Sequence, residues 1–102
     1  MYKQNCYTLK TIDQLPKKAR QVLLDNIDAD LIRLLTECVV NLLLGNLKGI
    51  SKQQASKHLN IIEAIHSKRH KRYRKEQRKL FKSDKGLALL QMITPVIITH
   101  FS

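Results

Sequence analysis

The sequence predicts a small all-α protein of four to five helices, with a long basic helix and an apolar C-terminal segment. Its 102 residues suit a single domain. Three glycines and two prolines are too few for a β-sandwich or barrel with many turns. Hydrophobic residues make up 43% of the chain, which excludes a fully disordered basic tail. So short a chain buries a modest core, so we expect limited stability or help from a partner.

The charge is distributed unevenly along the chain. The formal net charge is +11, made of +4 in residues 1–20, −3 in 21–47, +10 in 48–85 and none in 86–102. We therefore divide the single domain into four parts: an arm (1–12), an apolar helical core (13–65), a basic helix (66–85) and an apolar tail (86–102).

A first short helix is predicted to follow the arm. Asp13 is its expected N-cap, and Pro16 falls in the first turn, where a missing N–H does no harm. Val22 and Leu23 fall on its predicted apolar face, and Asn26 ends it.

The second predicted helix runs from 29 to 44, with Asp28 as N-cap and Gly45 as its stop. Its apolar face is wide, which is typical of a buried or oligomerising helix. We expect Val40 and Leu44 to stay exposed, because so short a chain cannot cover the whole face, and this favours a homodimer. The expected core or oligomer contacts are Leu31, Leu34, Leu35, Cys38, Val39 and Leu42.

Ser51 and Gln54 have the spacing of a capping box. They precede an apolar stripe at helical spacing, formed by Ala55, Leu59, Ile62 and Ile65. The stripe fades near His66. The sequence leaves open whether one long helix continues into the basic segment or two helices meet near Ser67, and two are favoured.

The basic segment holds nine cations within fifteen residues, opposed only by Glu76. Such a density cannot be confined to one helix face, so an anionic partner must offset the repulsion, and phosphate backbones do so with release of counterions. Alternative interpretations are a localisation tract, an acidic protein partner or an anionic membrane. The predicted nucleic-acid contacts are Lys68, Arg69, Lys71, Arg72, Arg74, Lys75, Arg78, Lys79 and Lys82.

The tail is uncharged. After a terminator at 83–86, residues 87–93 favour a last short helix that ends before Pro95, with an extended strand over 96–101 as a minority alternative. We expect the tail to fold back on the helix at 31–44. An oligomer contact or a membrane-active peptide are the other interpretations. No stretch of about 18 apolar residues occurs, so membrane contact is not favoured.

Catalytic and metal-binding patterns are weak. There is no glycine-rich phosphate loop and no nucleophile motif, so we expect no enzyme and no cofactor. Four histidines are interpreted as ordinary surface residues, and His66 and His70 lie in positive charge that repels a metal ion. Cys6 and Cys38 do not make a disulfide framework. Free, reduced thiols are expected, which indicates an intracellular setting.

Residues 28–47, with Glu37-Cys38, Asn41 and Gly45-Asn46, form a specific block. The block resembles one in small open reading frames of Maverick/Polinton elements and adenovirus-like animal viruses (adintoviruses). The similarity continues through a cap, a Lys/Arg-rich segment and a glycine turn to about residue 98. At that turn the family usually has Gly-Gly-Phe-Leu, reminiscent of a protease site. This chain has a single glycine, Gly86, so processing there does not carry over.

The family is likened to adenoviral core protein X, a small basic DNA-condensing component of the virion. The resemblance therefore implies a virion core or minor capsid role, with DNA rather than RNA and capsid proteins as partners, and the virion or host nucleus as location. We expect a homo-oligomer that neutralises and condenses DNA without reading bases. The alternatives are a membrane-active or scaffolding capsid component acting through the tail, and a DNA-binding regulator with a recognition helix near 51–66.

Overall fold

The structure, a computed structural model, describes residues 8, 10–12, 14–45 and 47–101, and in this part of the chain every regular element is helical. The elements are α2 (Lys17–Asn26), α3 (Ala29–Leu43), α4 (Lys52–Ser56), α5 (Leu59–Ser67), the 3-10 turn η1 (Lys71–Tyr73), α6 (Arg74–Lys82) and α7 (Asp84–Phe101). The predicted all-α class is confirmed. The described residues contain more helical elements than the four to five expected, because several of them are short.

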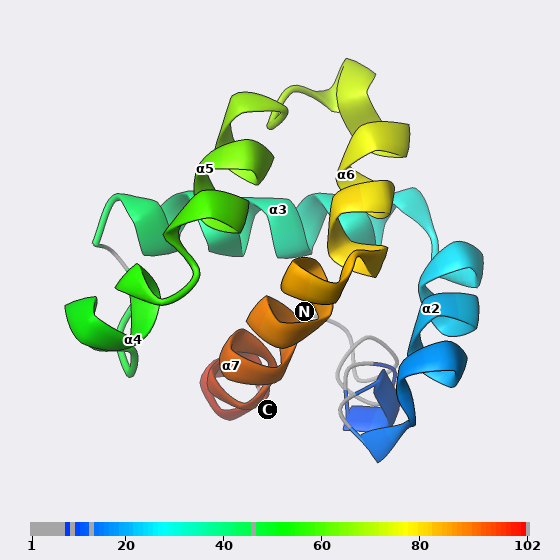
Figure 1. The fold of residues 1–102 in the computed structure, drawn as a ribbon, viewed down its shortest axis with the longest axis horizontal. Helices are drawn as coiled ribbons and strands as arrows, with labels where there is room; N and C mark the ends of the chain where they lie inside the picture. The colour runs from blue at the N-terminus through cyan, green and yellow to red at the C-terminus, as the bar shows by residue number, and fades with distance from the viewer. Residues whose placement is uncertain (1–7, 9, 13, 46, 102) are drawn as a thin grey trace.

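Helix α3 crosses the middle of the molecule, with α5 and α6 packed against it (Figure 1). Helix α7 packs on α6 and α5, and α2 packs on α6. The tail therefore folds back as expected, but its main partners are α6 and α5 rather than α3. One hydrophobic core joins residues of all these helices.

The ends of α3 follow from local sequence. The Asp28 carboxylate accepts a hydrogen bond from the backbone N–H of Leu31 at 2.9 Å, which satisfies a donor that the helix leaves free. At the other end Gly45 adopts a φ of +77°, a left-handed conformation that costs glycine little. Both predicted signals are confirmed.

The apolar face of α3 is mostly covered by its own chain. Leu31, Leu35, Cys38, Val39 and Leu42 are at most 6% exposed. Leu34 and Val40 are half-buried. Only Leu44, at 62% exposure, remains open to a partner, so the argument for a homodimer from an uncovered helix face is largely removed.

Helix α2 ends at Asn26, as predicted, but Pro16 is its N-cap rather than a residue of its first turn, and its inner face also differs. Val22 is 62% exposed, whereas Leu24 is fully buried. Packing on α6 decides which face turns inward, so the prediction for Val22 is wrong. Residues 8, 10–12 and 14 are helical, and Ile12, at the end of the expected arm, is 1% exposed and joins the core. Asp13 and Cys6 lie outside the described residues.

The capping box at Ser51 is confirmed in both directions. The Gln54 N–H donates to the Ser51 hydroxyl at 3.2 Å, and the Ser51 N–H donates to the Gln54 side chain at 2.9 Å. The helix that it starts has only five residues. The chain then turns before α5, which leaves Leu59 43% exposed, while Ile62 and Ile65 enter the core.

The basic segment is divided, as the two-helix interpretation favoured. Helix α5 ends at Ser67, residues 68–70 form a connection, η1 follows, and α6 begins at Arg74. Residues 66–85 thus do not form one long basic helix.

The junction between α6 and α7 is one residue long. The Ser83 hydroxyl accepts from the Gly86 N–H at 3.1 Å, and the Ser83 carbonyl accepts from Leu87 N–H at 2.8 Å, so Ser83 starts α7. The expected terminator at 83–86 therefore includes the first turn of a helix.

Helix α7 continues through Pro95 to Phe101, so the predicted stop before Pro95 and the alternative strand are both wrong. A proline inside a helix costs about 3 kcal/mol. Ile93 and Ile97 on either side of it are fully buried, and each buried isoleucine contributes about 1.5–3 kcal/mol. Tertiary burial therefore outweighs the local penalty.

Candidate nucleic-acid interface

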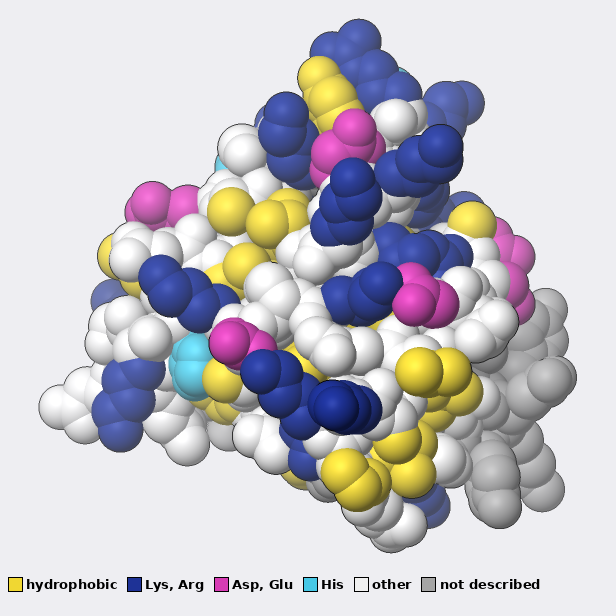
Figure 2. Space-filling view, turned by 45° about the vertical axis from the view of Figure 1, so that its right-hand side comes forward, with side chains coloured by type: hydrophobic (Ala, Val, Ile, Leu, Met, Phe, Trp, Pro, Cys, Tyr) yellow, Lys and Arg dark blue, Asp and Glu magenta, His cyan; other side chains and the backbone are white. Residues whose placement is uncertain are grey.

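The nine predicted contact residues come from three consecutive elements. Lys68 and Arg69 lie in the connection after α5, Lys71 and Arg72 in η1, and the other five in α6. In Figure 2, Lys and Arg side chains gather around the upper end of the molecule, where Figure 1 places the connection and the start of α6.

Six of the nine are exposed and form no ion pair with a carboxylate among the described residues. Their side chains have no internal counter-charge, so an external anion can reach each of them. We call these six the basic surface: Lys68, Arg69, Lys71, Arg72, Lys75 and Lys79.

Tyr73 organises part of the basic surface. The Lys68 ammonium lies 4.5 Å from the centroid of the Tyr73 ring, and the Arg72 guanidinium carbon lies 4.9 Å from it. Both contacts are cation–π interactions, each of about 0.5–1 kcal/mol at an exposed site. They hold two cations near each other despite their repulsion.

Arg78 is engaged inside the fold. Its Nη1 donates to the carbonyl oxygen of Leu24 and, at 2.7 Å, to that of Ile27. These carbonyls belong to the end of α2, where a helix leaves acceptors without partners. Arg78 therefore ties α2 to α6, a role that the sequence did not reveal.

Lys82 is also engaged internally. Its ammonium lies 2.5 Å from the Asp25 carboxylate, and its side chain is 29% exposed. Its backbone carbonyl accepts from the Gln21 amide at 2.9 Å. Arg78 and Lys82 thus hold α2 in place, and neither is counted in the basic surface.

Gln77 is a fully buried polar residue in the middle of the basic segment. Its amide nitrogen donates to the carbonyl oxygens of Lys68 at 2.6 Å and His70 at 3.1 Å. Its amide oxygen accepts from Arg74 Nη1. One side chain therefore fixes both the connection that carries Arg69 and the guanidinium of Arg74. Its only sequence signal was a neutral residue within a charged run.

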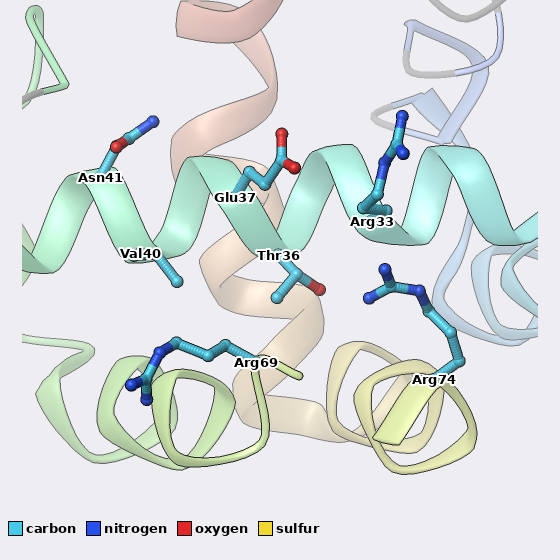
Figure 3. Close-up of a pocket in the computed structure, with 7 residues that line it drawn as sticks. All are labelled: Arg33, Thr36, Glu37, Val40, Asn41, Arg69 and Arg74. Atoms are coloured by element: carbon cyan, nitrogen blue, oxygen red, sulfur yellow. The ribbon is translucent and has the colours of Figure 1, made fainter. Parts of the chain in front are cut away.

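A pocket of about 410 Å³ lies between α3 and the basic segment (Figure 3). Three arginines from three different elements line it, together with one carboxylate. We call it the arginine pocket, lined by Arg33, Thr36, Glu37, Val40, Asn41, Arg69 and Arg74.

Arg33 was not among the predicted contacts, because it is the one base in an otherwise acidic segment. The signal that could have found it is its spacing. Arg33, Glu37 and Asn41 follow one another at four-residue intervals, which places three polar side chains on one side of an otherwise apolar helix. In the fold these three residues line the arginine pocket together with Arg69 and Arg74, but in Figure 3 they point to the side of α3 away from those two arginines, whereas Thr36 and Val40 point toward them.

Cys38 lies next to this side of α3 but faces the core at 6% exposure. Burial, and secondarily the neighbouring charge of Glu37, raises the pKa of its thiol to about 11. The thiolate, which is the nucleophile and the metal ligand, is therefore scarce at neutral pH.

His66 and His70 do not form a pair on one helix. His70 lies beyond the end of α5, so it does not share a helix with His66. Its Nδ1 accepts from the Arg72 N–H at 3.3 Å, which caps η1. Among the described residues, no group of three or more His, Cys, Asp or Glu side chains is placed to hold a metal ion.

None of the helices in the described part of the chain has the length and apolar character needed to cross a membrane. No protein-family model, curated protein or solved structure matches the chain. The family therefore stays a hypothesis that rests on the resemblance of residues 28–98 alone.

Proposed function

We propose that this protein is a non-enzymatic nucleic-acid-binding protein that neutralises phosphate backbones without reading base sequence. The observation that carries the proposal is the basic surface, six exposed cations that have no carboxylate partner among the described residues. Each phosphate that such a cation neutralises releases condensed counterions, and that release drives association. Exposed lysines and arginines on a loop, a 3-10 turn and a short helix contact backbones more readily than one groove.

The salt dependence of binding tests this proposal directly. If each of the six cations reaches one phosphate, log affinity for duplex DNA falls with log salt with a slope of about −5, from −0.9 per contact. The assay is fluorescence anisotropy with duplexes of random sequence, between about 50 and 200 mM salt. A slope near zero contradicts the proposal. A saturable preference for one duplex over scrambled competitor supports the regulator instead.

Two triple variants with the same charge change sharpen the assay. Three losses on the basic surface should reduce the slope by about 2.7, whereas three losses on α4 and its flanks should leave it nearly unchanged. Equal effects would mean that only net charge matters. The first variant is Lys71→Gln, Lys75→Gln and Lys79→Gln, and the control is Lys48→Gln, Lys52→Gln and Lys57→Gln, all exposed positions.

The proposal extends to a virion core or minor capsid component that condenses DNA, with capsid proteins as partners in the virion or host nucleus. What supports this extension is the resemblance of residues 28–98 and the charge of the chain. Preference for DNA over RNA belongs to the same extension, because a charge cluster alone does not sense the 2′-hydroxyl. Self-association also belongs to it. Light scattering of protein–DNA mixtures, sedimentation equilibrium and competition between DNA and RNA duplexes test its three parts.

The rival, a membrane-active or scaffolding component that acts through the tail, is less consistent with the packing. Leu87, Leu89, Leu90, Ile93 and Ile97 are at most 4% exposed in the core, so a membrane could reach them only after α7 left the fold. Deletion of residues 87–102 separates the two functions. Collapse of the helical circular dichroism signal supports the core role, and loss of liposome leakage with DNA binding retained supports the rival.

A further inference from the structure

Tyr73 lies among the exposed cations of the basic surface and contacts two of them. The Lys68 ammonium is 4.5 Å and the Arg72 guanidinium carbon 4.9 Å from the centroid of its ring. Because both distances end at the same centroid, the two cations lie no more than 9.4 Å apart, the sum of the two distances. At the upper end of the molecule in Figure 2, a side chain of the hydrophobic class, which includes tyrosine, lies among Lys and Arg side chains. One ring therefore gathers two positive charges that repel each other.

An aromatic ring differs from a carboxylate as a partner of these cations. A carboxylate would neutralise the charge, whereas the ring attracts it through its quadrupole and leaves it uncompensated. The Lys68 and Arg72 side chains make no hydrogen bond or ion pair to another described residue. An ammonium has three N–H donors and a guanidinium five. Both cations are thus held in place with their charge and their donors available to an external anion.

The backbone that carries the two cations is fixed as well. The fully buried Gln77 amide donates to the carbonyl oxygens of Lys68 at 2.6 Å and His70 at 3.1 Å. The His70 carbonyl also accepts from the Tyr73 N–H at 2.9 Å, and His70 Nδ1 accepts from the Arg72 N–H at 3.3 Å. The free protein therefore already holds much of the arrangement, and less ordering has to accompany binding.

A nucleic-acid strand offers anions at a matching spacing. Successive phosphates of one strand of duplex DNA are about 3.4 Å apart along the helix axis. Two cations no more than 9.4 Å apart can therefore contact neighbouring phosphates of one strand, without a contribution from the second strand. An arginine binds a phosphate in bidentate fashion, while a lysine acts as a point charge.

We propose that Lys68 and Arg72, held by Tyr73, form a clamp on neighbouring phosphates of one nucleic-acid strand, with Tyr73 as its positioning residue. The inference rests on the proposed function and assigns a role in binding to a side chain that carries no charge. Because the clamp follows one strand, single-stranded and double-stranded nucleic acids are both its ligands.

Tyr73→Leu tests the clamp in the same anisotropy assay, because it removes the ring without changing the charge. We expect binding to weaken roughly fivefold at every salt concentration, the order of magnitude that ordering long side chains on binding costs. The salt slope should stay that of the wild type, because the number of cations is unchanged. Tyr73→Phe keeps the ring and should bind like the wild type. Tyr73 is half-buried, so thermal unfolding and amide exchange in residues 68–73 are measured for both variants.

A second arm repeats Tyr73→Leu in a background that carries Lys68→Gln and Arg72→Gln. The background alone should lower the magnitude of the salt slope by about 1.8, from 0.9 for each of two phosphate contacts. The ring then has no cation to hold, so Tyr73→Leu should cause no further loss of affinity. An equal loss in this background, or a loss confined to single strands, would mean that the ring stacks on a base, and either result overturns the clamp.

The remaining outcomes also decide between the two proposals. Equal affinities of the wild type and Tyr73→Leu, or equally weak binding of Tyr73→Phe and Tyr73→Leu, overturn the clamp and leave the proposed function intact. Faster amide exchange in residues 68–73 of Tyr73→Leu traces the loss to backbone disorder and overturns the clamp as well. A wild-type slope near zero overturns both proposals.

Discussion

Substitution of Gly86 by alanine adds only one methyl group, but it should greatly lower the free energy of unfolding. A Cβ built on Gly86 lies 1.9 Å from the Leu80 carbonyl oxygen and 2.8 Å from the Phe81 Cα. Both are backbone atoms of α6, which cannot rotate away as a side chain would. Even a 3.0 Å contact, which real Cβ atoms almost never go below, requires the oxygen and the methyl to separate by about 1.1 Å.

The cost follows from what this separation disturbs. Phe81 is fully buried on one side of the junction, and Leu87, Leu89 and Leu90 are at most 4% exposed on the other. A gap of about 1 Å forfeits a quarter to a half of each dispersion contact that it opens. Overpacking commonly costs about 1–3 kcal/mol. With rigid backbone on one side, we expect about 3 kcal/mol or more, or a Tm lower by roughly 12 °C or more.

Gly45→Ala is the matched control. Gly45 has a φ of +77° and no atom within 4 Å of a built Cβ, so this substitution introduces backbone strain without a clash. We expect it to cost about 1–2 kcal/mol. Urea unfolding followed by circular dichroism measures both. A loss at Gly86 equal to or smaller than that at Gly45 would refute the close approach of α6 and α7.

Three further predictions concern buried polar groups. Thr94→Val should stabilise the fold by about 1 kcal/mol in urea unfolding, because the Thr94 hydroxyl is buried and finds no hydrogen-bond partner in the described part of the chain; destabilisation would show that it has one. Burial raises the pKa of Cys38 to about 11 from 9.0, so alkylation at Cys38, read by peptide mass spectrometry, should be about 100-fold slower than for an ordinary thiol at neutral pH and rise tenfold per pH unit. Fast labelling at neutral pH would contradict the burial. The stability that the neutral thiol contributes is complete below pH 9 and declines from pH 9 to 11. Gln77→Leu should speed amide exchange in residues 68–73 and weaken DNA binding even though it removes no charge, because two carbonyls and the Arg74 guanidinium lose their partner; unchanged exchange would exclude the positioning role.

Local signals in the sequence were sufficient for several elements. Each of these signals acts between residues that are close in sequence, so the local sequence is enough to set it. They are the cap at Asp28, the left-handed Gly45 and the capping box at Ser51. The spacing of apolar residues in α3 identified the core side chains for the same reason. The expectation that part of this face stays uncovered did not anticipate that α5 and α6 pack on it, whereas self-association itself stays a prediction.

The candidate site could be predicted only in part. The density of cations between residues 68 and 82 was visible in the sequence. Which of them stay exposed and which are engaged inside the fold was not. Arg78 binds the end of α2 from 54 and 51 residues away, and Lys82 pairs with Asp25. Arg33 enters the pocket from an acidic segment. Contacts over such separations leave no periodic trace.

The amino-acid sequence by itself determined the helical class, the starts of α3 and α4 and the high density of positive charge, because propensity, capping and charge act locally. The tertiary structure alone decided that α7 passes Pro95, that Gly86 must lack a side chain and that arginines from separate parts of the chain line one pocket. Each of these depends on which helices come together, and burial of apolar surface among several helices sets that arrangement.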